Sequence, residues 1–262
     1  MPNSIVALFL ATAAVCGGSF ATAAPAEKIV TYRGTATELA TRRPLYSEQH
    51  FLRYRDDQIA QRIVLYQCAD GRPFARKQVE YVDRFAPDFD TVDVGRGLHE
   101  GLRSRSGERE VFYRETTADT EATKLLPRTK EMVADAGFDE FVRAHWDALL
   151  SGQSKKLDFL VPSRLGVHAF RVSHVHATVT DGIPSQVFRL RLSGVLGWVL
   201  PAIEVYYSDA QRTLVRYEGL SNLQDAEGNH YKARIVFPPQ DRLVSDVAAL
   251  RKAQEAPLRP CG

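Results

Sequence analysis

Apolar and polar residues alternate in short stretches along most of the chain, and turn residues separate these stretches. Alternation with a period of two puts one face of a strand on a core and the other in water, so the stretches predict antiparallel strands. Asp70-Gly71 and Asp181-Gly182 supply tight hairpin turns. The predicted strands cover residues 28–38, 45–54, 59–68, 74–82, 98–102, 110–115, 156–161, 167–179, 187–192, 203–207, 213–217 and 231–237.

Residues 136–150 follow a helical pattern between the two groups of strands. Large apolar side chains recur there every three or four residues, which predicts an amphipathic helix of about four turns. Its aromatic-rich stripe consists of Phe138, Phe141, Val142, His145, Trp146 and Leu149. We expect this helix to fill the hollow of a curved sheet. A second, C-terminal helix is predicted from the apolar stripe Leu243, Val244, Val247 and Leu250.

These elements predict a mainly β (α+β) fold, in which a curved antiparallel sheet or half-barrel surrounds a central amphipathic helix. The alternation of apolar and polar residues is weaker over residues 83–107, which are predicted to be a longer connection with one short strand. The acidic residues of that connection, Asp88, Asp90 and Asp93, are interpreted as part of a solvated loop. No repeat or low-complexity linker divides the sequence, so residues 24–262 are predicted to form a single β-rich domain.

The first residues predict export. An apolar run over residues 5–15 is too short to span a bilayer, and Ala21-Thr22-Ala23 follows it as a cleavage site, so residues 1–23 are predicted to be a signal peptide. We therefore expect a periplasmic protein. Cys68 and Cys261 remain after cleavage, and in an oxidising compartment they either form a disulfide or stay as independent thiols.

Composition narrows the function. The sequence is 44% hydrophobic and 25% charged with a formal net charge of +2, which is typical of an ordinary globular protein and excludes a strongly basic nucleic-acid binder. The outward positions of the C-terminal strands are mostly basic. They predict either a cationic surface, for peripheral contact with anionic lipid head groups of a membrane or with an acidic partner, or, preferably, a mixed solvated face. These positions are Arg189, Arg191, Arg212, Arg216, Lys232 and Arg234.

Candidate chemistry is sparse. His174 and His176 have the spacing of two side chains on one face of a strand, and His168 has the same parity, so a zinc or copper site is a weak alternative to structural histidines. No nucleophile motif or paired carboxylate gives positive support to an enzyme, and no cofactor is predicted.

Three segments resemble an uncharacterised family of exported bacterial β-rich proteins. They are 137–142 (GFDEFV), 159–165 (FLVPSRL) and 217–223 (YEGLSNL). The architecture is also similar to the periplasmic lipoprotein carriers of the LolA and LolB kind, in which a curved antiparallel sheet and helices enclose a hydrophobic cavity. This chain lacks the helix that precedes their first strand, and no functional residue carries over.

The leading hypothesis is therefore a non-enzymatic periplasmic protein that binds an apolar or lipid-like ligand, as a carrier or an envelope-maintenance factor. The residues expected to line its cavity are Phe138, Phe141, Trp146, Phe159, Trp198 and Tyr206. The alternatives are a structural or interaction module with a filled core and a metal-dependent hydrolase that uses His168, His174 and His176.

Overall fold

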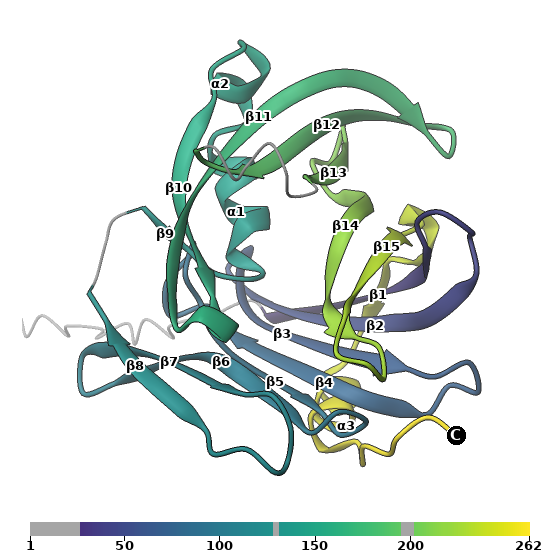
Figure 1. Cartoon of the computed structure of the whole chain (residues 1–262). Coiled ribbons are helices and arrows are strands. Elements are labelled where there is room, and N and C mark those ends of the chain that lie inside the picture. The colour runs from purple at the N-terminus through teal and green to yellow at the C-terminus, as the bar shows by residue number, and fades with distance from the viewer. Residues whose placement is uncertain (1–26, 128–130, 195–201) are drawn as a thin grey trace, which may run out of the picture.

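The computed structural model describes residues 27–127, 131–194 and 202–262. The predicted signal peptide and Trp198 lie outside these residues. Every described strand belongs to one curved sheet, whose hydrogen-bonded path runs from β8 through β1 to β9 (Figure 1). The described strands pair antiparallel, except that β9 and β10 are parallel. The sheet stays open, because the path begins at β8 and ends at β9.

Two arms of strands meet at β1. The first arm contains β1 (Glu27–Glu38), β2 (Pro44–Arg55), β3 (Gln58–Gln67), β4 (Pro73–Glu80), β5 (Asp88–Asp93), β6 (Leu98–Arg105), β7 (Glu108–Arg114) and β8 (Ala122–Leu126). The second arm contains β9 (Met132–Val133), β10 (Lys155–Val161), β11 (Gly166–Thr180), β12 (Ile183–Leu192), β13 (Ile203–Ser208), β14 (Leu214–Gln224) and β15 (His230–Val236). β15 and the short β16 (Leu243–Ser245) both pair with β1.

The described helices are α1 (Gly137–Ala144), α2 (Trp146–Leu150) and α3 (Val247–Glu255), with 3₁₀ turns η1 (Pro162–Arg164) and η3 (Pro239–Asp241). α1 lies inside the curve of the sheet (Figure 1). The mainly β, open curved sheet around a central helix confirms the predicted fold class. No helix among the described residues combines the length and the apolar character needed to cross a membrane.

The aromatic stripe of the central segment is buried in the hollow, as predicted. Phe138, Phe141, Trp146 and Leu149 pack in one cluster with side chains from β10 to β13. The predicted four-turn helix is wrong in one respect, because the helix breaks at His145. There the imidazole Nδ1 lies 2.9 Å from the carbonyl oxygen of Phe141, and the backbone leaves helical geometry before α2 starts.

α1 begins at a point of close backbone contact. A Cβ atom on Gly137 would lie 1.9 Å from the carbonyl oxygen of Phe85, so only glycine fits there. The neighbouring amide of Ala134 also donates to Phe85 across this contact, at 2.9 Å. The segment between β4 and β5 therefore holds the start of α1 against the first arm of the sheet.

Side-chain packing brings the two free ends of the sheet together. Leu160 from β10 and Met132 from β9 share a buried cluster with Leu102 from β6 and Val111 from β7. η1 also contacts β6 and β7. The half-barrel is thus closed at this side by apolar contact instead of by strand pairing.

The structure corrects two local predictions. Residues 88–93 form the strand β5, in which Phe89, Thr91 and Asp93 are buried, so the interpretation of a solvated acidic loop is wrong. Leu243 and Val244 belong to β16 and are exposed, while the C-terminal helix starts only at Val247.

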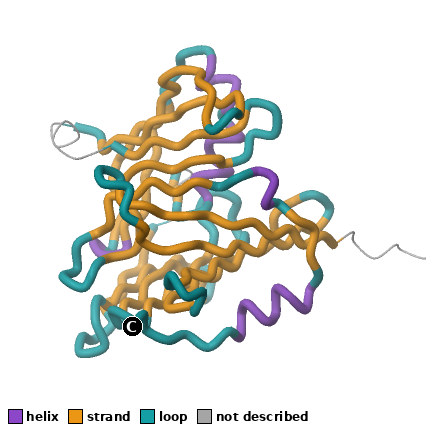
Figure 2. Tube along the Cα trace, turned by 90° about the vertical axis from the view of Figure 1, so that its right-hand side faces the viewer, coloured by secondary structure: helices purple, strands orange, loops and turns teal. Residues whose placement is uncertain are grey.

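α3 covers the convex face of the sheet (Figure 2). Leu250 and Ala253 pack there against Ile29, Ile63 and Leu65 from β1 and β3. The chain then returns to the turn before β4, where Cys261 forms a disulfide with Cys68 at a Cα–Cα distance of 5.7 Å. The two cysteines therefore form a disulfide and are not independent thiols.

We predict that Cys261→Ser lowers the free energy of unfolding by roughly 2–4 kcal/mol, because the disulfide joins positions 193 residues apart and so restricts the unfolded chain. Urea unfolding at constant pH measures the change. A reducing agent should bring the native protein to the value of the variant and leave the variant unchanged; equal stability of all three samples would contradict the prediction.

Candidate functional site

A cavity of about 210 Å³, which is half open to solvent, lies between α1 and the concave face of the sheet. β2, β3 and β4 supply one wall, and β10 with β12 to β15 supplies the other. The lining residues of the apolar wall include Phe138, Phe159, Leu190, Ile203, Val205, Leu214, Ile235 and Phe237. Hollows of about 380 and 390 Å³ lie at hairpin ends elsewhere and are lined mainly by charged and polar side chains. The interior cavity is therefore the candidate site for an apolar ligand.

The opposite wall of this cavity is charged. Glu48, His50, Arg62 and Lys77 project into it from three neighbouring strands. Strand register explains their assembly: His50 pairs with Val64, and Val64 pairs with Lys77, so the side chains of this row share one face of the sheet. All four polar side chains are buried.

Glu48 and His50 form the first buried pair. His50 Nε2 lies 2.7 Å from Glu48 Oε2, and the imidazole stacks on Tyr32 with ring centroids 4.4 Å apart. Phe237 contacts the same imidazole edge-on. Burial lowers the pKa of His50, and the hydrogen bond with Glu48 offsets this only in part. His50 is therefore neutral at pH 7.

Arg62 and Asp139 form the second pair and tie the sheet to the helix. Arg62 Nη2 donates to Asp139 Oδ2 at 3.0 Å, and the Tyr207 hydroxyl donates to Asp139 Oδ1 at 2.7 Å. Burial alone would raise the pKa of Asp139, but Arg62 and Arg143 nearby hold it below its ordinary value. Asp139 thus remains a carboxylate within the fold.

Lys77 and Asp135 form the third pair, at the turn that enters α1. Asn222 from β14 donates to the same Asp135 oxygen at 3.0 Å, so this contact joins the two walls. Glu100 on β6 interacts electrostatically with both members of this pair. Burial raises its pKa to about 7, with Lys77 lowering and Asp135 raising it.

Some of the predicted lining residues lie at the cavity and others do not. Phe138 and Phe159 line the cavity. Phe141 and Trp146 are buried elsewhere in the core, where Trp146 packs on Phe188 with ring centroids 5.0 Å apart. Trp198 lies outside the described residues.

Tyr206 lies on the outer face of β13. Its hydroxyl donates to Glu204 at 3.1 Å, and its ring lies under the guanidinium of Arg216. Its neighbours Val205 and Tyr207 are both buried, so they face the core and Tyr206 points the other way.

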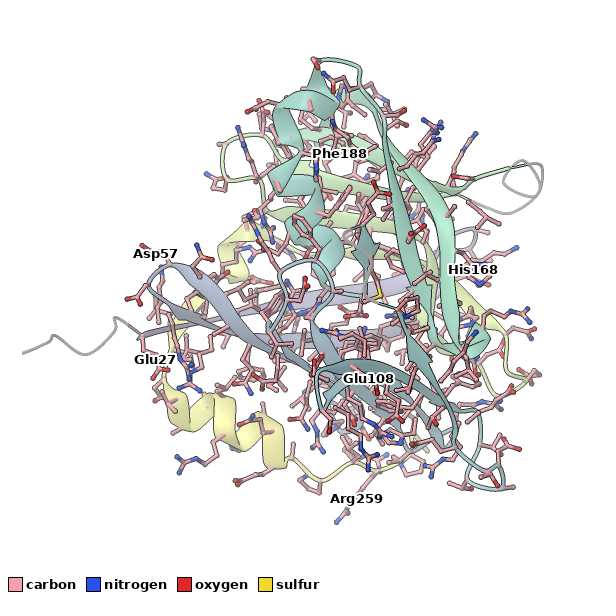
Figure 3. The ribbon with its side chains drawn as sticks, turned by 90° about the vertical axis from the view of Figure 1, so that its left-hand side faces the viewer. Glu27, Asp57, Glu108, His168, Phe188 and Arg259 are labelled. Carbon is pink, nitrogen blue, oxygen red and sulfur yellow. A yellow bond between two sulfur atoms is a disulfide. The ribbon has the colours of Figure 1, made fainter. Side chains whose placement is uncertain are left out.

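The three histidines on β11 do not converge. A bulge between His174 and His176 sets His174 opposite Phe188 and His176 opposite Val187, so the two imidazoles lie on opposite faces and the predicted spacing is broken. His174 lies 2.9 Å from Gln186, and His168 lies farther along the strand, away from Phe188 and α2 (Figure 3). Within the described ranges no three potential ligands come close enough to hold a metal ion.

The basic outer strands form a mixed face. Arg189 bonds to Glu204, and Arg234 bonds to Glu218 at 2.6 Å. Arg216 contacts Asp181 at 2.8 Å. These pairs neutralise much of the charge expected for a cationic surface, in agreement with the preferred mixed face.

The charged wall is the feature that the sequence analysis missed, although a signal was present. Glu48 and His50 occupy the same parity as Tyr46 and Leu52, which are core positions of β2. Polar residues at core-facing positions of an otherwise alternating strand mark either a polar site or a buried pair. Which of the two applies depends on the neighbouring strands.

Two solved structures are similar to this one in architecture. One is a beta-barrel-like protein of the domain of unknown function DUF1849 from Brucella abortus, with 12% identity, 84% of this chain and 98% of that chain covered, and a TM-score of 0.40. The other is a putative outer membrane lipoprotein-sorting protein domain from Vibrio parahaemolyticus, with 9% identity, 87% and 89% coverage, and a TM-score of 0.30. No protein-family model and no curated protein matches the sequence. Both similarities are weak, as the low identities and TM-scores show.

We predict that Asp139→Leu lowers the free energy of unfolding by about 3–5 kcal/mol, because it leaves the Arg62 charge buried without its carboxylate. The double variant Arg62→Met/Asp139→Leu should recover most of that loss. Asp147→Leu, which removes the exposed partner of Arg212, should change stability by no more than about 1 kcal/mol. Urea unfolding of the four proteins makes the comparison, and failure of the double variant to recover stability would contradict it.

Glu100 should make stability depend on pH. Its pKa is about 7 in the fold and about 4.3 in an unfolded chain, so the folded state holds one proton more between these values. Glu100 should therefore contribute a loss of stability as pH rises from 5 to 7, by up to about 3 kcal/mol at about 1.4 kcal/mol for each pKa unit.

Glu100→Gln tests this dependence, since glutamine stays neutral throughout. The stability of the variant relative to the native protein should increase from pH 5 to pH 8 in urea unfolding. Glu108→Gln, at an exposed hairpin position, is the control and should track the native protein. A difference between Glu100→Gln and the native protein that stays constant with pH would contradict the raised pKa.

Proposed function

We propose that this protein binds an apolar or lipid-like ligand in the interior cavity, as a carrier or an envelope-maintenance factor. The observation that carries the proposal is the apolar wall from Phe138 and Phe159 to Leu190 and Val205, which borders open space inside the sheet. Such a wall normally packs against other side chains, because close packing is the rule in protein interiors. Open space beside it favours a binding protein over a module with a filled core.

The size of the cavity limits the ligand. Pockets for drug-sized ligands measure about 300–1,000 Å³, and this cavity measures about 210 Å³. The cavity is therefore smaller than a typical site for a drug-sized ligand. We therefore expect one short alkyl chain, or one end of a longer chain, and not a complete two-chain lipid.

The disulfide supports export to the periplasm. Cys68 and Cys261 are paired, and structural disulfides persist mainly in oxidising compartments. This agrees with the proposed signal peptide over residues 1–23 and with one domain over residues 24–262. Mass spectrometry of protein recovered from the periplasm would give the mature N-terminus.

Ligand-observed NMR with 1-octanol, octanoic acid and monooctanoylglycerol tests the binding function. We expect saturation transfer from the native protein to at least one of them, and a loss of about tenfold or more in affinity for Leu214→Trp, which fills the cavity. Val179→Trp adds the same indole at a position that is 68% exposed and should bind like the native protein. Absence of transfer to all three compounds, or equal binding by both variants, would overturn the proposal.

A further inference from the structure

We infer that the ligand carries an uncharged hydroxyl group and that His50 and Arg62 bind this group at the charged wall of the cavity. The inference rests on the proposed function and names the polar chemistry of the same site. It depends on two buried atoms that have no hydrogen-bond partner among the described residues, His50 Nδ1 and Arg62 Nε.

His50 supplies a hydrogen-bond acceptor. Its Nε2 lies 2.7 Å from a Glu48 carboxyl oxygen, which is an acceptor, so we assign the proton of the neutral imidazole to Nε2. Nδ1 is then a free lone pair. His50 is only 6% exposed, and its ring is fixed between Tyr32, Phe237 and Glu48. Buried acceptors normally have a hydrogen-bond partner, and because His50 lines the cavity, we assign that partner to the ligand.

Arg62 supplies a hydrogen-bond donor. Its Nη2 is engaged by Asp139, but its Nε–H, on a side chain that is 8% exposed, has no acceptor within the described residues. Guanidinium nitrogens only donate. The cavity wall thus presents one acceptor and one donor.

Strand register places the two groups beside each other. His50 is directly opposite Val64, and Arg62 is two residues before Val64 on the same strand. Diagonal neighbours of this kind have Cα atoms about 7–8 Å apart and share a face of the sheet, so their long side chains reach one small group between them. Both residues line the cavity.

Charge argues against an ionised head group. The cations of the lining, Arg62 and Lys77, both already have carboxylate partners, Asp139 and Asp135. An anionic head group would have to compete with these carboxylates for the two cations. An ammonium group would donate to His50 but could not accept from Arg62. A hydroxyl does both and carries no charge.

Four probes with an alkyl chain of similar length separate these chemistries: 1-octanol, heptyl methyl ether, octanoate at pH 8 and octylammonium. The ether has the same number of heavy atoms as octanol and accepts a hydrogen bond without donating one. We expect the native protein to bind octanol about tenfold more tightly than the ether, which is the factor that one buried hydrogen bond of about 1.4 kcal/mol gives. Both ions should bind more weakly than octanol. NMR titration gives the four dissociation constants.

The double variant Glu48→Leu/His50→Phe removes both partners of the buried pair and keeps an aromatic ring against Tyr32. Replacing both members avoids leaving one of them buried alone. Its affinity for octanol should fall to that for the ether, while the ether should bind within about twofold of the native value. The control Asp90→Leu/His99→Phe removes a histidine–carboxylate pair outside the cavity lining and should keep the tenfold preference.

The outcomes distinguish this inference from the proposed function. If octanol and the ether bind the native protein equally, or if either ion binds most tightly, the cavity binds apolar chains but water satisfies His50 and Arg62, and the inference is overturned alone. Retention of the octanol preference by Glu48→Leu/His50→Phe overturns it in the same way. If none of the four probes binds while monooctanoylglycerol does, the inference alone is overturned. If monooctanoylglycerol also fails to bind, the inference and the proposed function are both overturned.

Discussion

Burial of the α1 and α2 aromatic side chains against the second arm of the sheet is the interaction on which this structure depends. An open, strongly curved sheet leaves its concave face exposed unless another element covers it. Trp146 and Phe141 provide that cover, at about 1.5–3 kcal/mol for each large apolar side chain removed from water. The contact between Gly137 and Phe85 sets where this helix starts and therefore how much of the hollow it fills.

The part of the hollow beside β2 to β4 is organised differently. Its inward positions carry Arg62 and Lys77, whose carboxylate partners, Asp139 and Asp135, stand in and before α1. Isolated charges in such a place would be strongly unfavourable, whereas paired ones hold the helix in one register against the sheet. The same residues give the cavity its polar wall, so stability and candidate binding chemistry draw on one set of side chains.

Much of this architecture follows from the alternation of apolar and polar residues. β1 to β4 and β11 lie close to their predicted limits, because each is a long stretch rich in strand-forming residues that ends at a turn. β5 was missed because aspartates, which are poor strand formers, occupy three of its six positions. Leu243 and Val244 fit a helical stripe by spacing, but pairing with β1 makes them part of a strand.

The candidate site was harder to predict than the fold. Phe138 and Phe159 were chosen by helix spacing and by strand hydrophobicity, and both line the cavity. Tyr206 was chosen in place of Tyr207, because a single aromatic pair does not reveal which member faces inward. The bulge next to His174 likewise changes the face of later residues without any glycine or proline to mark it.

The central place of β1 has a consequence for folding. One edge of β1 pairs with β2, which follows directly in the chain. Its other edge pairs with β15, where Thr35 lies opposite Val236, so this pairing needs a strand from near the C-terminus. Nearly the whole sequence must be present before the two arms can join, and contacts of such long range form slowly. Until β15 pairs with β1, the free edge of β1 is open to pairing with other chains. A chaperone that binds the unfinished chain would therefore matter most in the interval before the C-terminal strands are available.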